Sequence, residues 1–243
     1  GSGPHAVDRN DFAGGVLPSG TVTFAPGQAS RSITIQVQAD RLQENDESFL
    51  LSLSNPSGAS IATPSASGVL RNDDLIGTAT ADTITGSHWP DFLDGLAGTD
   101  VLTGRGGPDL FGFRFGQSRL DIPDRITDLR FGVDKLSLFT PTDQPRPVLA
   151  FCRAADNGNA SSLTGLASAV FADANGSLAG SQPLTANTAA LVRSTHPAIA
   201  GLYLLVNNND PALSLGNDLM VNLSGFSGTL PALGVIPVST LFP

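Results

Sequence analysis

Hydrophobic and polar residues alternate in several short stretches near the start of this 243-residue chain. The clearest runs cover residues 21–24, 32–38 and 49–53, where every second side chain is Val, Ile, Leu or Phe. A period of two is typical of half-buried β-strands, and turn signals such as Pro26-Gly27 separate the runs. We therefore predict strands across residues 20–71, each with one apolar face, packed as a β-sandwich.

A different pattern, with a period of nine residues, follows in residues 77–112. Each unit has a glycine, an aspartate five positions later and a large apolar residue two positions after that. The glycines are Gly77, Gly86, Gly95 and Gly104, the aspartates are Asp82, Asp91, Asp100 and Asp109, and the apolar residues are Ile84, Leu93, Leu102 and Phe111. Glycine permits a sharp turn, the carboxylate supplies a hard oxygen ligand, and the apolar side chain points into a core. The register predicts a short parallel β-roll with calcium at its turns. The alternative, an ordinary Gly/Asp-rich loop, would not keep three residue types in register four times.

The four units resemble the nonapeptide G-G-x-G-x-D-x-U-x of RTX (repeat-in-toxin) proteins, in which U is a large apolar residue. The glycine at the fourth position is present as Gly98 and Gly107. Thr80 and Trp89 stand at that position in the first two units, so the resemblance is weakest there.

The RTX resemblance implies that two units form one turn of the roll. Aspartates two units apart then face each other, which pairs Asp82 with Asp100 and Asp91 with Asp109. It thus implies two complete Ca²⁺ sites, built from these aspartates and the glycine turns.

Residues 124–138 resemble the D-x-I-x-D-F-x-x-G-x-D-x-L-x-L segment that follows RTX repeats in serralysin-type proteases. In that segment Asp128 and Asp134 either complete a calcium site or cap turns, and both alternatives stay open. Apolar residues recur at helical spacing from Leu163 to Phe171, which predicts a helix that ends near Gly176, with Gly176 as a left-handed residue at its C-terminus. Strands are predicted at residues 190–193, 202–206 and 219–223.

The phrases at residues 171–177, 187–192 and 236–242 look like the bluetail C-terminal domain. That domain ends large bacterial surface proteins that carry RTX repeats. This resemblance covers about residues 120–243.

Residues 8–74 resemble a Calx-beta domain without its opening strands. The resemblance is carried by residues 11–12, 19–27, 53–56 and 72–74. It implies that acidic residues at one end of the sandwich bind calcium, and the candidates are Asp40, Glu44, Asp73 and Asp74. Solvated loop acids are the alternative for these four residues.

The amino-acid composition limits which partners and which classes of function are compatible with this chain. A net charge of −9 argues against nucleic acid and anionic membranes as partners. The acids are twenty Asp against two Glu, which favours turns and metal ligation over helix surfaces. The single cysteine, Cys152, cannot form an internal disulfide, and no apolar run is long enough to span a membrane. No H-E-x-x-H or G-x-S-x-G motif occurs, so we predict no enzymatic activity.

These observations predict a mainly β chain with an incomplete Calx-beta sandwich, a short parallel β-roll with calcium, and a β-rich C-terminal domain with one helix. The predicted boundaries are 1–74, 75–118 and 119–243. The start Gly-Ser-Gly without methionine indicates a fragment of a longer protein.

The function predicted from these resemblances is a calcium-binding structural and secretion module. It would stand at the C-terminal end of a large extracellular or cell-surface, adhesin-like bacterial protein. The implied partners are calcium, the type I secretion machinery and a cell-surface or matrix ligand. One alternative is the targeting domain of a secreted RTX hydrolase or metalloprotease whose catalytic domain lies upstream. Another is an adhesive binding module, which the scarcity of Trp and Tyr disfavours.

Overall fold

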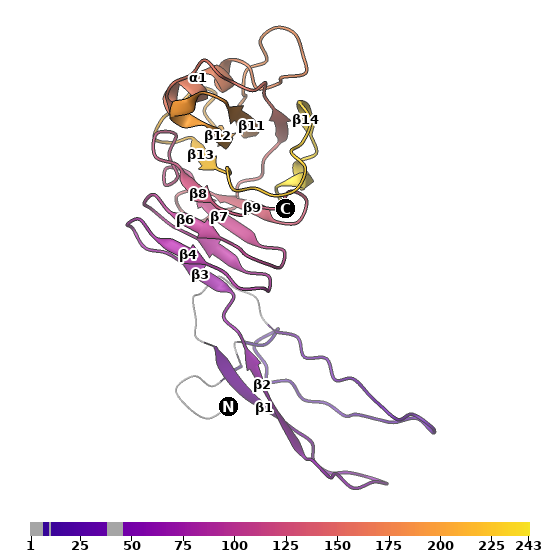
Figure 1. The fold of residues 1–243 in the computed structure, drawn as a ribbon. Helices are drawn as coiled ribbons and strands as arrows, with labels where there is room; N and C mark the ends of the chain where they lie inside the picture. Colours follow the sequence, from indigo (N-terminus) through magenta and orange to yellow (C-terminus); the bar gives the residue numbers. More distant parts are fainter. Residues whose placement is uncertain (1–6, 10, 38–45) are drawn as a thin grey trace. The chain divides into compact units, whose positions relative to one another are not determined.

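The computed structural model describes residues 7–9, 11–37 and 46–243, and the chain divides into two compact units, Gly1–Asn72 and Asp73–Pro243 (Figure 1). The described residues are mainly β, with one α-helix, which confirms the predicted fold class. The roll and the C-terminal segment lie in the same unit, so the predicted boundary near residue 118 stays a prediction.

Among its described residues, the N-terminal unit has one antiparallel strand pair, β1 (Glu47–Ser52) and β2 (Ser65–Leu70), with Glu47 opposite Leu70. The strands predicted over residues 21–24 and 32–37 do not form; an isolated bridge from Phe12 to Val37 is the pairing found there among the described residues. Phe24 and Ile33 are 54% and 44% exposed. Without a second sheet to pack on, alternation alone does not stabilise a strand.

The second unit begins with a parallel β-roll made of two sheets. One sheet contains β3 (Asp74–Ile76), β5 (Phe92–Asp94), β7 (Leu110–Arg114) and β9 (Lys135–Phe139). The other contains β4 (Thr83–Thr85), β6 (Val101–Thr103) and β8 (Asp124–Ile126). Successive strands alternate between the sheets, and all neighbours within these sets are parallel. Two nonapeptides therefore form one coil, as the RTX resemblance implies.

The apolar residue of each repeat forms a ladder inside the roll. In one sheet Leu75, Leu93, Phe111 and Leu136 stand in register, and in the other Ile84, Leu102 and Ile126 do so. All seven belong to or pack against one core cluster. Fully burying a Leu or Phe side chain contributes about 1.5–3 kcal/mol, so this ladder is the main apolar contribution of the short strands.

The C-terminal segment adds five strands and the helix. The strands are β10 (Ala150–Arg153), β11 (Thr188–Ser194), β12 (Gly201–Val206), β13 (Leu219–Asn222) and β14 (Gly234–Ile236). The helix α1 (Leu163–Ala172) begins at Ser162, whose Oγ accepts a hydrogen bond from Gly165 N at 3.1 Å. Short 3₁₀ turns occupy Pro197–Ile199 and Val238–Thr240. The predicted helix and the three predicted strands are thus confirmed.

The predicted role of Gly176 as a left-handed cap is wrong. The helix ends at Ala172 with extended Asp173 as its cap, and Gly176 does not have a positive φ. Glycine is needed there for space, because a Cβ would lie 2.3 Å from Ala155 N.

One sheet runs from the last C-terminal strand into the roll. Its order is β14-β10-β11-β12-β13-β8-β6-β4, and β13 pairs in parallel with β8 (Figure 1). Phe151, Leu204 and Phe242 share a core cluster with the roll residues, whereas α1 packs on a second cluster that includes Ala190 and Leu205. The C-terminal segment therefore closes one end of the roll.

Candidate metal centre

Seven aspartates stack in two columns at the corners of the roll. The first column is Asp82, Asp100 and Asp124, and the second is Asp73, Asp91, Asp109 and Asp134. Asp124 is the first residue of β8, and each of the other six stands immediately before a roll strand. The carbonyls of five of these six accept a hydrogen bond from the next coil: Val101 N donates to Asp82 O, Arg125 N to Asp100 O, Phe92 N to Asp73 O, Leu110 N to Asp91 O and Lys135 N to Asp109 O. The parallel register therefore brings the repeat aspartates into line.

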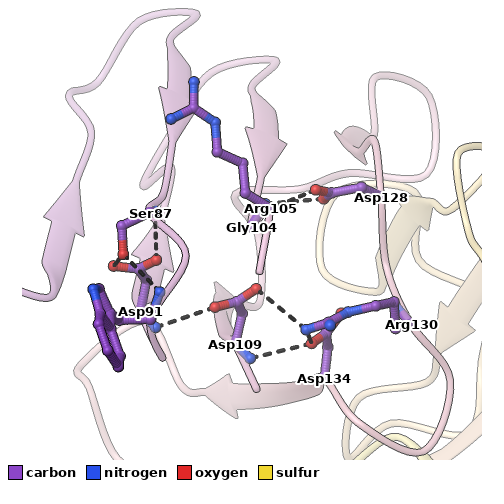
Figure 2. A network of polar contacts seen from close by, with 9 residues as sticks. Ser87, Asp91, Gly104, Arg105, Asp109, Asp128, Arg130 and Asp134 are labelled. Atoms are coloured by element: carbon purple, nitrogen blue, oxygen red, sulfur yellow. Dashed lines mark hydrogen bonds and ion pairs between the residues drawn. The ribbon is translucent and has the colours of Figure 1, made fainter. Parts of the chain in front are cut away.

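In each column the later carboxylates accept a hydrogen bond from the backbone of the preceding coil. Asp82 N donates to Asp100 Oδ1 at 2.8 Å, and Asp100 N donates to Asp124 Oδ1 at 2.8 Å. In the second column, Asp91 N donates to Asp109 Oδ1 and Asp109 N donates to Asp134 Oδ1, both at 3.2 Å (Figure 2). The pairs expected from the repeat are adjacent; whether they bind metal stays a prediction.

Three of the carboxylates use their second oxygen to cap their own turn. The acceptor is Oδ2 and the donor is the backbone N–H four residues earlier. These bonds are Thr78 N to Asp82 at 2.6 Å, Ser87 N to Asp91 at 2.6 Å and Arg130 N to Asp134 at 2.7 Å. In Asp91 and Asp134 the first oxygen is bonded as well, by Ser87 Oγ and by Asp109 N, both at 3.2 Å, so the chain satisfies both oxygens of these two carboxylates.

Asp100 and Asp109 are different, because their Oδ2 atoms are buried and have no hydrogen-bond partner among the described residues. The amides that would cap them are bonded elsewhere. Leu96 N donates to Asp94 Oδ1 at 2.9 Å, and Arg105 N donates to Asp128 Oδ2 at 2.7 Å. A buried acceptor without a partner costs about 1–3 kcal/mol, and more when charged. These two oxygens are therefore suited to a cation.

Burial also perturbs the acidity of this cluster. Desolvation raises the pKa of Asp109 to about 7 and that of Asp124 to about 7, and it raises the pKa of Asp100. Hydrogen bonds from backbone amides oppose the shift, and neighbouring carboxylates add to it. The cluster thus resists carrying full negative charge, and a bound divalent ion would reverse that preference.

The repeat glycines make room for the carboxylates. A Cβ on Gly95 would lie 2.3 Å from Asp100 Oδ2, and one on Gly104 would lie 2.3 Å from Asp109 Oδ2. On Gly77 and Gly86 it would meet the carbonyl oxygens of the next coil, Gly95 O at 2.5 Å and Gly104 O at 2.8 Å. Each turn thus leaves a space next to its glycine that is lined by oxygen atoms. The side chain of any other residue at the glycine position would fill that space.

The glycines at the fourth position serve the turn itself. Gly98 and Gly107 have φ of 145° and 87°, a region that side chains rarely adopt. Thr80 and Trp89 stand at this position in the first two units without a positive φ, so those turns have a different backbone shape.

The donor set fits calcium better than zinc. Within the described residues, no three or more His, Cys, Asp or Glu side chains form a group that could hold a metal by themselves. An ion between coils would have two carboxylates and would complete its shell from carbonyls and water. Calcium accepts such oxygen ligands readily, whereas zinc prefers His and Cys.

The remaining predicted ligands have different surroundings. Asp128 caps the amides of Gly104 and Arg105, at 2.9 and 2.7 Å. Asp134 belongs to the second column and pairs with Arg130 at 2.9 Å (Figure 2). Asp73 and Asp74 stand at the start of the roll unit, with Asp74 buried in β3, and Asp40 and Glu44 lie outside the described residues.

The sequence pattern missed two members of the site, Asp124 and Arg130. Asp124 follows Asp100 by 24 residues and Asp134 follows Asp109 by 25, so the nine-residue register is broken. One feature of the repeat is still present in the sequence here. Each of these two aspartates has an apolar residue two positions later, Ile126 or Leu136, which completes the ladder in its sheet.

Comparison with known families covers the N-terminal segment. The Calx-beta domain family matches residues 6–75, which confirms the Calx-beta resemblance there. No curated protein and no solved structure matches the chain. In the part of the chain that the structure describes, no helix is long and apolar enough to cross a membrane. Residues 6–75 thus carry the Calx-beta pattern, and the roll that follows is described by its own geometry.

Proposed function

We propose that residues 73–139 form a calcium-dependent β-roll in a structural and secretion module. The observation that carries this proposal is that two buried carboxylate oxygens, Asp100 Oδ2 and Asp109 Oδ2, accept no hydrogen bond. Each stands beside the glycine of its own turn and within a column of carboxylates from adjacent coils. Calcium between coils would neutralise both columns and hold successive turns together.

The roll strands are short, so the ion supplies free energy that the chain lacks. Most of them are three residues long, and their turns are rich in glycine, whose ordering is entropically costly. Without the ion, stacked carboxylates repel one another. Extracellular calcium modules bind with dissociation constants of about 10⁻⁴–10⁻³ M, so the sites would fill outside the cell and stay empty in the cytosol. Binding free energy then becomes folding free energy.

Calcium-dependent folding of the roll suggests a role for it within the full-length protein. A segment that folds when calcium is plentiful suits the C-terminal end of a large extracellular or cell-surface bacterial protein. Type I secretion machinery would export it unfolded, and a cell-surface or matrix ligand would be engaged by the whole protein. The Calx-beta match of residues 6–75 supports this setting, because that family is associated with calcium and its match precedes the roll in the sequence.

Calcium titration of the metal-free chain tests the proposal. Two sites at ten times their dissociation constant would stabilise the fold by about 2.8 kcal/mol, from RT ln(1 + [Ca²⁺]/Kd) at each. Circular dichroism and urea unfolding in 5 mM CaCl₂ and in chelator measure this gain. Asp100→Asn should lose at least half of it.

Asp156→Asn is the matched control for charge. Asp156 is partly exposed and pairs with Arg153, outside both columns. This variant should keep the full calcium response. Equal stability of the wild type in calcium and in chelator would refute the proposal.

A further inference from the structure

We propose that the roll binds one calcium ion more than its repeats predict, between Asp100 and Asp124, and that Arg130 replaces the ion at the equivalent step between Asp109 and Asp134. This inference rests on the proposed calcium function and deepens it. It makes the two columns unequal at the end where the C-terminal segment closes the roll.

The step from Asp100 to Asp124 reproduces the step from Asp82 to Asp100. In both, the N–H of the earlier aspartate donates to Oδ1 of the later one at 2.8 Å. The strands that follow are parallel and in register, with Val101 opposite Arg125. An ion that fits the first of these steps therefore has the same pair of carboxylates available at the second.

Two observations indicate a cation at the Asp100–Asp124 step. Asp100 is fully buried, and its Oδ2 has no hydrogen-bond partner. Among the described residues, no arginine or lysine forms an ion pair with Asp100 or Asp124. Two buried carboxylates thus meet here without a positive charge from the chain.

Asp124 is also held in place by groups outside the repeats. Its N–H donates to Ser118 Oγ at 2.9 Å, and that hydroxyl donates to Met220 O at 2.6 Å. Asp124 is paired in register with Val221 of β13. The sheet of the C-terminal segment therefore holds this carboxylate beside Asp100 in the folded chain.

The second column has a guanidinium at the corresponding step. Arg130 Nη2 lies 2.9 Å from Asp134 Oδ1 and 4.0 Å from Asp109 Oδ2, so it bridges the two carboxylates (Figure 2). The carboxylate of Asp128 accepts hydrogen bonds from the amides of Gly104 and Arg105, in the turn before Asp109. This step thus contains both a positive charge and capped turn amides, and it has no need of an ion. At the last step of the second column, Arg130 supplies the positive charge. At the last step of the first column, between Asp100 and Asp124, no side chain does so among the described residues.

Calcium uptake by variants of the full chain tests this assignment. The number of ions bound on folding is measured from the dependence of the unfolding free energy on the logarithm of calcium concentration, and checked by equilibrium dialysis with radioactive calcium. Asp124→Asn should bind one ion fewer than the wild type. Arg130→Gln should bind one ion more, because it frees the carboxylates of Asp109 and Asp134.

Asp121→Asn is the matched control, since Asp121 is exposed, pairs with Arg119 and lies outside both columns. It should bind the wild-type number. If Asp124→Asn fails to fold, Arg130→Gln decides by its gain of an ion. An unchanged count in Asp124→Asn, or in Arg130→Gln, would overturn the assignment while leaving the proposed function in place. Absence of any uptake by the wild type would instead refute the proposed function.

Discussion

At the scale of single residues, the aspartates of the columns differ in how their second oxygen is used. Asp82, Asp91 and Asp134 cap amides four residues earlier, whereas Asp100 and Asp109 each have a buried oxygen that accepts no hydrogen bond. The nonapeptide could not reveal this difference, because all four repeat aspartates look alike in it. The difference arises because Leu96 N donates to Asp94 and Arg105 N donates to Asp128, so neither amide is available to Asp100 or Asp109. These bonds depend on the folded shape of the turns.

The raised pKa of Asp109 predicts a pH dependence of the metal-free protein. Its pKa rises from 3.8 to about 7 in the folded state, so the folded state holds the proton more tightly than the unfolded state between these values. The free energy of unfolding should therefore fall as the pH rises from about 4 to 7, and calcium should stabilise more at pH 8 than at pH 5. Urea unfolding at both pH values, with and without calcium, measures this.

Asp109→Asn should flatten that slope, because it removes the titrating group while keeping the hydrogen-bond acceptor toward Asp91. A metal-free wild type whose stability rises between pH 5 and pH 8 by more than that of the variant would contradict the assigned direction.

At the scale of elements, the period of nine predicted more of the structure than the period of two. Alternation in residues 21–24 and 32–37 has the form of a strand, yet these residues lack a partner sheet and remain without strand structure in the described chain. The roll succeeds because each coil is the partner of the next, so glycine, aspartate and apolar residue are satisfied by neighbours with the same pattern. The column members beyond residue 112 could not be predicted from the period of nine, because loops of unequal length separate Asp124 and Asp134 from the repeats.

The turns of the roll should tolerate substitution only where space allows. Gly107 has φ of 87°, and a Cβ there would lie 2.3 Å from Trp89 C and 2.5 Å from Pro90 N. Because the obstacle is backbone of the neighbouring coil, Gly107→Ala should lower the free energy of unfolding by at least about 2 kcal/mol. Urea unfolding in saturating calcium measures the loss.

Gly216→Ala serves as its control. A Cβ at Gly216 meets nothing within 4 Å, and its φ is not positive. This variant should match the wild type, and comparable losses in both variants would show that the crowding at Gly107 is not the cause.

At the scale of the whole molecule, the second unit contains the roll and its C-terminal segment as one body. Leu93, Leu102 and Phe111 of the roll share a core cluster with Phe151, Leu204 and Phe242. The backbone hydrogen bonds of one sheet also continue from β4 to β14. The N-terminal unit, in contrast, has its own contacts and ends at Asn72.

Truncation should separate these contributions. A fragment of residues 73–243 should keep the calcium-induced circular dichroism change of the full chain, because the second unit has a complete core. A fragment of residues 73–140 should remain unfolded at 5 mM calcium, because β13 and the buried side chains beyond residue 140 are removed. Equal calcium responses of the two fragments would show that the roll needs no support from the C-terminal segment.

The alternation of strands between two sheets also restricts how the length of the roll can change. Eighteen extra residues after Thr85 would add a complete coil, about 4.8 Å long, and would leave β3 and β4 on their present sheets. Nine extra residues would transfer both strands to the opposite sheets and would shift every upstream aspartate to the other column. Insertions and deletions in this part of the gene are thus compatible with the architecture only in whole coils.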